Sequence, residues 1–182
     1  GMIRVLHICY PYRAGNFEAT TIAYVNQYQP ELTIVHSTIV PGTITQIHQQ
    51  IGGMLAYSPV RGKHTRMVED LLQYTKFIAG TSQDACDMGE KYLSAANFKT
   101  KKVEKLEALE LAKILETTYF GLLLAWAQEI ERISKSLDVD YEDALLLTEE
   151  VNYLPPVHFQ PGYIGGHCIM PNIELLEKIY KS

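Results

Sequence analysis

Short apolar runs alternate with amphipathic segments over the first hundred residues of the chain. The apolar runs are rich in β-branched residues and end at proline, glycine or polar residues, which predicts buried strands. The segments between them repeat apolar residues at helical spacing, which predicts helices. We expect strands at 5–10, 32–38, 54–58, 76–80 and 102–106, and helices at 17–28, 43–51 and 82–96. This alternation predicts an α/β fold with a mainly parallel sheet.

The pattern changes after about residue 104. From Leu106 to Leu137 the sequence has no proline and repeats apolar residues at helical spacing, which predicts one helix of about 30 residues. Between Phe120 and Ala127 this helix is apolar on all faces, so every face needs cover. A helix predicted at 141–151 of the same chain could supply the cover, but a homodimer through the long helix is the interpretation that we favour. We therefore expect an α/β domain over 1–104 and a helical dimerisation domain over 105–182.

Composition and charge narrow the classes of function. With 47% hydrophobic residues among 182, the chain can bury a core. Its net charge of −5 and the lack of a Lys/Arg-rich run argue against a nucleic-acid partner. Cys9, Cys86 and Cys168 are far apart, which fits reduced thiols in a cytoplasmic protein. The most apolar run, 119–127, is much shorter than the roughly 20 residues that span a bilayer, so we expect no membrane partner.

A cysteine near the end of the chain is the sharpest candidate for chemistry. Cys168 follows Gly165 and Gly166, which let the backbone approach a ligand closely, and it precedes a helix predicted at 172–180. A thiolate in such a position is a good covalent nucleophile, although a lone cysteine is also commonly buried and inert. His158 and His167 are nearby, but their spacing with Cys168 matches no common zinc pattern, so we expect no metal.

Two further candidates follow predicted strands. The segment 37–43 is a strand end, a turn and a helix start, where free N–H groups attract anions, and Thr38 places a hydroxyl there. By itself it is more simply an ordinary turn with a capping threonine. The loop after the third strand holds Arg61 and Lys63 in an otherwise acidic chain, which suits either a phosphate ligand or a solvated loop.

Lys113 and Thr117 are four residues apart on the long predicted helix, so they share one face. A lysine among leucines usually extends its ammonium group to water, and this is the reading that spacing favours. In an active site the same cation would stabilise an oxyanion.

These segments occur in an order that resembles the UDP-glucose/GDP-mannose dehydrogenase family, the NAD-dependent nucleotide-sugar dehydrogenases. Four segments carry the resemblance: a strand ending in proline, a Ser-Thr-Val-x-Pro-Gly-Thr turn, an Ala-Glu-x-x-Lys helix that runs on to an Asn-Glu pair, and a Gly-Gly-x-Cys motif. They are represented here by 6–11, 37–43, 109–129 and 165–168.

The resemblance implies a Rossmann-like sheet, a helical dimerisation domain and an active-site thiol. The family oxidises a sugar C6 alcohol twice, to the carboxylate, with two NAD, and its cysteine holds the intermediate as a thiohemiacetal and then a thioester. Cys168 would be the nucleophile, Lys113 would stabilise the oxyanion and Thr38 would hold the reactive water or hydroxyl. Pro11 and Ser37 would lie with Thr38 at the cofactor. Arg61, Lys63, Gly165 and Gly166 would contact the substrate.

The chain departs from the family pattern around the thiol. Thr117 and Asn172 replace an asparagine and an aspartate, and Val60 replaces a glutamate. The sequence has no G-x-G-x-x-G, and the family's first βαβ unit would lie before residue 1. We therefore expect a truncated form that does not hold NAD by itself and has impaired turnover. The alternative is a non-catalytic dimeric binding or regulatory module derived from the family.

Overall fold

The computed structural model describes residues 3–13, 16–154, 159–165 and 169–180. These fall into two compact units, Gly1–Ile114 with Leu175–Ser182, and Leu115–Glu174. The division lies inside the long helix. The boundary that the sequence suggests at residue 104 stays a prediction.

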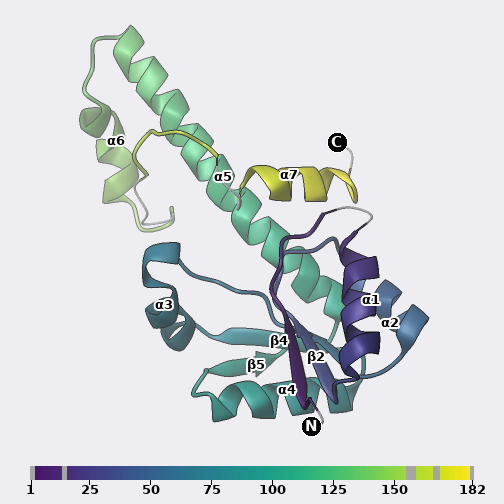
Figure 1. The fold of residues 1–182 in the computed structure, drawn as a ribbon. Coiled ribbons are helices and arrows are strands. Elements are labelled where there is room, and N and C mark those ends of the chain that lie inside the picture. The colour runs from purple at the N-terminus through teal and green to yellow at the C-terminus, as the bar shows by residue number, and fades with distance from the viewer. Residues whose placement is uncertain (1–2, 14–15, 155–158, 166–168, 181–182) are drawn as a thin grey trace. The chain divides into compact units, whose positions relative to one another are not determined.

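The first unit holds a five-stranded sheet (Figure 1). Its strands lie side by side in chain order: β1 (Val5–Ile8), β2 (Leu32–Val35), β3 (Leu55–Tyr57), β4 (Lys76–Gly80) and β5 (Thr100–Lys102). The pairs β1–β2, β2–β3 and β4–β5 are parallel, which confirms a mainly parallel α/β sheet.

The sheet is mixed, because β4 runs antiparallel to β3 and β5 runs parallel to β4, so the last two strands run opposite to the first three. For two neighbouring strands to be parallel, the connection must carry the chain from the end of one strand back to the level at which that strand began. The segment between β3 and β4 contains only a short 3-10 turn (His64–Arg66) and helix α3 (Met67–Gln73). This connection leaves the chain at the end of the sheet where β3 ended. Strand β4 therefore starts beside the end of β3 and runs back along it.

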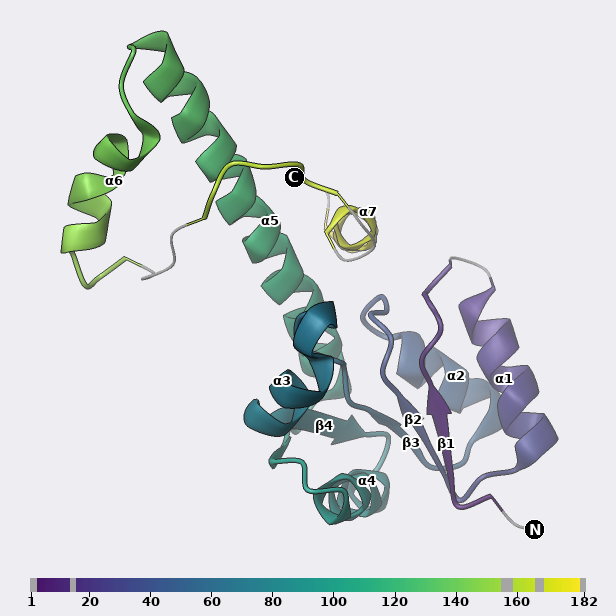
Figure 2. The ribbon, with the colours of Figure 1, turned by 60° about the vertical axis from the view of Figure 1, so that its left-hand side comes forward.

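Helices cover both faces of this sheet (Figure 2). Helices α1 (Phe17–Tyr28) and α2 (Thr43–Ile51) pack on one face, together with the first turns of the long helix, and α4 (Gln83–Ala95) packs on the other. Adjacent residues of β2 point to opposite faces, with Ile34 in the α4 cluster and Val35 in the α1/α2 cluster. Gly80 is needed where α4 meets β4, since a Cβ there would lie 2.5 Å from the backbone nitrogen of Cys86.

The elements agree well with the hydrophobic pattern. Helices 17–28 and 43–51 and strand 76–80 have the predicted bounds, while β1 and β2 end two or three residues early. The last strand lies at 100–102 instead of 102–106. Its residues are polar and partly or fully exposed. Of the apolar residues in the predicted range, Val103 follows the strand and packs against the core, and Leu106 begins the next helix.

The second unit is helical. Helix α5 (Leu106–Ser136) has 31 residues, which confirms the long helix. From Leu115 onward it lies in this unit, with α6 (Tyr141–Glu150) and the start of α7 (Met170–Glu177). Asp140 caps α6, because its Oδ1 accepts from the backbone N–H of Glu142 at 2.9 Å. Within the described residues, no helix is both long and apolar enough to cross a membrane.

Candidate functional site

The ends of β1 and β2 meet at one edge of the sheet, where the sequence places Pro11, Ser37 and Thr38. The Ser37 hydroxyl donates to the backbone oxygen of Tyr10 at 2.5 Å and so ties the two strand ends together. Thr38 is partly exposed beside it, and Pro11 is exposed. Parallel strands of α/β proteins present ligand sites at this edge.

The start of α2 is occupied by a side chain of the same molecule. The N–H groups of Gly42 and Ile44 donate to the two carboxyl oxygens of Glu110, at 2.6 and 3.1 Å. Glu110 lies on α5 and is fully buried, and burial raises its pKa to about 7. These amides, which the sequence suggested for an external anion, are therefore bonded internally. The sequence contains Glu110 in the resembling helix, but nothing local shows that it reaches α2.

A hydrogen-bonded chain of polar side chains lies on the α4 face of the sheet. His36 is buried, with Nδ1 2.6 Å from the Ser58 backbone oxygen and Nε2 2.9 Å from Nδ1 of His7. Nε2 of His7 is 3.3 Å from the Tyr92 hydroxyl. The carbonyl can only accept, so His36 donates from Nδ1, His7 donates to His36, and Tyr92 donates to His7. Burial, with the nearby charge of Lys76, lowers the pKa of His36 to about 3, so both rings are neutral.

Lys76 is a buried cation at the same edge. Its Nζ donates to the backbone oxygens of Ser58 and Pro59, at 3.0 and 3.2 Å. Burial lowers its pKa to about 8, and the half-buried Lys113 adds to the lowering. Burial raises the pKa of the exposed Cys9 thiol, and the positive charge of Lys76 opposes this increase.

The loop that carries Arg61 and Lys63 is held by α3 and β4. The Arg61 guanidinium lies 5.9 Å from the ring centre of Tyr74 and 5.8 Å from that of Phe77. The Lys63 N–H donates to Oδ2 of the buried Asp70 at 2.8 Å, and the Lys63 side chain is exposed. Part of the loop is thus held against the protein. The sequence suggested either a phosphate ligand or a solvated loop, and neither alternative describes these contacts.

In the second unit, two candidate residues are in direct contact. The Asn172 side-chain amide donates to the Thr117 hydroxyl at 2.6 Å, and Asn172 is 4% exposed. One turn further along α5, Gly121 admits Ile169, because a Cβ there would lie 2.7 Å from Ile169 Cγ2. The segment 169–172 is thereby anchored to one face of α5. Gly165 is partly buried, and Gly166 and Cys168 lie outside the described residues.

Comparison with known proteins identifies the helical part. Residues 107–182 match the UDP-glucose/GDP-mannose dehydrogenase family, central domain. Through this segment the chain is similar to the UDP-glucose/GDP-mannose dehydrogenase family. Members of this family are NAD-dependent. The resemblance noted in the sequence is confirmed.

Individual relatives agree with this family. The chain is 30% identical to UDP-N-acetyl-D-glucosamine 6-dehydrogenase of Salmonella typhi over 152 residues, which cover 76% of this chain and 35% of the relative. It is 29% identical to UDP-N-acetyl-D-mannosamine dehydrogenase of Methanocaldococcus jannaschii over 147 residues, which cover 76% and 33%. The chain thus spans about a third of the length of these relatives.

Solved structures show the same fold. The UDP-D-ManNAc dehydrogenase of Pyrococcus horikoshii superposes with a TM-score of 0.84 at 24% identity, covering 98% of this chain and 47% of that one. A UDP-glucose dehydrogenase of Pyrobaculum islandicum gives 0.78 at 18% identity, covering 97% and 46%. At these identities the likeness concerns the fold.

Proposed function

We propose that the chain is the substrate-binding and dimerising part of a nucleotide-sugar dehydrogenase, in which Cys168 captures a sugar C6 aldehyde. The observation that carries this is the hydrogen bond between Asn172 and Thr117, which fixes the segment just after Cys168 to α5. A nucleophile must be held at a defined position to attack, and anchoring of the adjacent segment supplies this. The similarity of residues 107–182 to this family supports the choice of reaction.

The chemistry of this chain is then one covalent step. The Cys168 sulfur forms a bond to C6 of the aldehyde, the carbonyl π electrons move to the oxygen, and that oxygen takes up the proton lost by the thiol. The product is a thiohemiacetal. By the family resemblance, the Lys113 cation stabilises the developing alkoxide and Thr38 holds a water or hydroxyl near it. Thr117 and Asn172 act as positioning residues.

The described residues do not form a dinucleotide site at the start of α2, because Glu110 already occupies the amides there. The sequence also lacks the glycine fingerprint that holds a pyrophosphate. Bound NAD would accept the hydrides in both oxidations of the family. We therefore propose that the chain by itself has impaired turnover. Asn172, which cannot take a proton at neutral pH, adds to the impairment.

The substrate class that we propose is a UDP-N-acetylhexosamine, because the relatives named above act on such sugars. A ligand that binds only the folded state raises the melting temperature. We expect UDP-N-acetylmannosamine or UDP-N-acetylglucosamine to raise the Tm of the chain, and GDP-mannose and NAD at equal concentration to leave it unchanged. A shift with NAD alone would contradict the argument about α2. No shift with any sugar nucleotide would remove the support for substrate binding.

The role of Cys168 is tested by alkylation with iodoacetamide, followed by mass spectrometry. Cys9, which is exposed and whose pKa burial raises, is a matched internal control. We expect Cys168 to react at least tenfold faster than Cys9 at pH 7 and to be protected by the UDP-sugar, while Cys9 is not protected. A slow Cys168 that the sugar does not protect would favour the non-catalytic alternative.

Dimerisation is proposed from apolar side chains that one chain leaves uncovered. On α5, Leu122 and Trp126 are 63% and 59% exposed, and on α6, Leu147 is 84% exposed. The run from Phe120 to Ala127 is apolar on all faces and needs cover on each of them. Helix α6 buries Leu145 but leaves Leu122 and Trp126 of this run exposed. A second copy is the occupant that we propose, because these large apolar side chains would otherwise stay in contact with water.

This proposal predicts the mass in solution. Light scattering after size exclusion should give a dimer for the chain and a monomer for Trp126→Glu. Val68→Glu is the matched control, because Val68 on α3 is 71% exposed but lies outside the second unit. A monomeric parent chain would refute the homodimer. A dimer that binds no sugar nucleotide would favour the second candidate function, a dimeric binding or regulatory module.

A further inference from the structure

The segment 159–165 crosses α5 (Figure 2) and is held by side chains of α5 and α6. The hydroxyl of Tyr141 on α6 donates to the backbone oxygen of Phe159 at 2.6 Å. The side-chain amide of Gln128 on α5 donates to the backbone oxygen of Gly162. All of these residues belong to the second unit. The backbone that leads into residue 163 is therefore fixed to the two helices.

Tyr163 follows these contacts directly, yet its side chain is 93% exposed. A Cβ on Gly165 would collide with the Tyr163 ring, so the glycine lets one face of this ring lie against the backbone. The opposite face of the ring is turned to solvent. An aromatic ring with one face held by the protein and the other face open is suited to stack on a flat or apolar part of a ligand.

Two contacts on α5 relate Tyr163 to Cys168. Gln128 holds residue 162, and Gly121 admits the side chain of residue 169. These two helix positions are seven residues apart, so they lie on one face of α5, about 10 Å from each other. Tyr163 comes directly after the first held residue, and Cys168 comes directly before the second. The tyrosine side chain and the thiol are therefore near enough to contact the same sugar.

We propose that the Tyr163 ring is a platform for the pyranose ring of the nucleotide sugar and orients its C6 toward Cys168. The faces of a pyranose present C–H groups, which pack on the electron-rich face of an aromatic ring, while the hydroxyl groups at its rim stay in water. This inference rests on the proposed function for the identity of the substrate. It adds a residue that recognises the sugar and not the nucleotide part.

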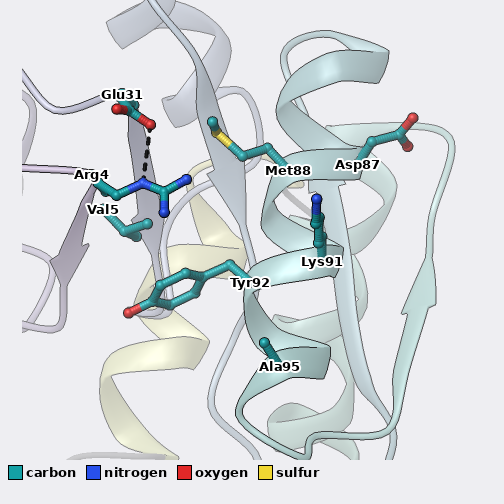
Figure 3. A pocket seen from close by; sticks show the side chains of 8 residues that line it. All are labelled: Arg4, Val5, Glu31, Asp87, Met88, Lys91, Tyr92 and Ala95. Atoms are coloured by element: carbon teal, nitrogen blue, oxygen red, sulfur yellow. Dashed lines mark hydrogen bonds and ion pairs between the residues drawn. The ribbon is translucent and has the colours of Figure 1, made fainter.

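A pocket of about 460 Å³ beside β1 and α4, in the first unit, is an alternative place for the ligand (Figure 3). Its lining combines the ring of Tyr92 with the cations of Arg4 and Lys91. Arg4 is already paired with Glu31, at 3.5 Å. A diphosphate in this pocket would therefore depend on Lys91, which is exposed. Lys91→Glu tests the pocket without altering the second unit.

Calorimetric titration of the 182-residue chain with UDP-N-acetylglucosamine and with UDP measures the contribution of the ring. Tyr163→Leu removes the aromatic face, and Tyr163→Phe keeps it. Tyr153→Leu is the matched control, because Tyr153 is 80% exposed in the same unit. We expect Tyr163→Leu to weaken binding of UDP-N-acetylglucosamine about fivefold or more and to leave binding of UDP unchanged. Tyr163→Phe, Tyr153→Leu and Lys91→Glu should bind both ligands as the parent chain does.

The outcomes separate this inference from the proposed function. A parent chain that does not bind UDP-N-acetylglucosamine would refute the proposed function and the platform together. Binding that Tyr163→Leu leaves unchanged would overturn the platform alone. An equal loss for UDP would assign the ring to the uracil base, and a loss in Lys91→Glu would place the ligand in the first unit, so either result overturns the proposal. A Tyr163→Leu chain that no longer dimerises would assign the ring to the interface instead.

Discussion

Replacement of Glu110 by alanine should destabilise the first unit strongly at acidic pH. The substitution leaves the N–H groups of Gly42 and Ile44 without their acceptors at 2.6 and 3.1 Å, in a site where Glu110 is fully buried. An unsatisfied buried donor costs about 1–3 kcal/mol, so two such donors should lower the free energy of unfolding by about 2–6 kcal/mol at pH 4.5.

The cost should shrink as the pH rises. Burial raises the pKa of Glu110 from 4.5 to about 7, so the folded state favours the neutral carboxyl group. The stability that this provides is complete below pH 4.5 and is lost as the pH rises through 7, which amounts to about 3 kcal/mol. Alanine does not titrate. The difference in stability between the parent chain and Glu110→Ala should therefore fall between pH 4.5 and pH 8.

Urea denaturation at several pH values measures this difference directly. Glu107→Ala is the matched control on the same helix, since Glu107 also reaches α2, accepting from the Thr45 hydroxyl at 2.7 Å, but at an exposed position. We expect this control to cost less than about 1 kcal/mol. A Glu110→Ala variant no less stable than Glu107→Ala at pH 4.5, or a difference from the parent that does not change with pH, would refute the reasoning.

Three other substitutions test separate contacts. Thr117→Val and Asn172→Ala should each cost about 1 kcal/mol, and a double-mutant cycle in urea should show coupling, because the two side chains share a 2.6 Å bond; additive effects would contradict it. Gly80→Ala should cost about 2 kcal/mol or more in thermal unfolding, since its Cβ would lie 2.5 Å from the Cys86 nitrogen, and an unchanged Tm would count against that close approach. Burial lowers the Lys76 pKa from 10.5 to about 8. Between pH 8 and 10.5 the free energy of unfolding of the parent chain should therefore rise by about 3 kcal/mol relative to that of Lys76→Met. Parallel pH profiles of the two proteins would rule out a buried ammonium.

Local signals account for what the sequence predicted well. The helices at 17–28 and 43–51 follow from apolar spacing that is complete within each segment, and the 31-residue α5 follows from a long stretch without proline. The direction of β4 did not follow, because strand direction depends on which edge the preceding connection reaches. The family resemblance also came from short segments, and the match over 107–182 confirms it.

The site was harder to predict, because its contacts join distant parts of the chain. Glu110 and Gly42 are 68 residues apart, and Asn172 and Thr117 are 55 apart. Neither pair has a local signature in the sequence. His7 and His36 had one, since each is a polar residue at a strand position that faces α4. Polar side chains at such positions usually need a partner, and this signal could have located the chain of imidazoles.

The reversal of β4 has a consequence for how a charge is held at the end of the sheet where β1, β2 and β3 end. Residues that follow β1, β2 and β3 lie in loops, which tolerate change and movement. Lys76, by contrast, is the first residue of β4, and it reaches that end only because β4 runs the opposite way. Its backbone pairs with Thr100 of β5, and its N–H donates to the Lys99 carbonyl at 2.7 Å. The reversed direction of β4 thus places a cation at this end of the sheet on a strand residue, which backbone pairing with β5 holds in position.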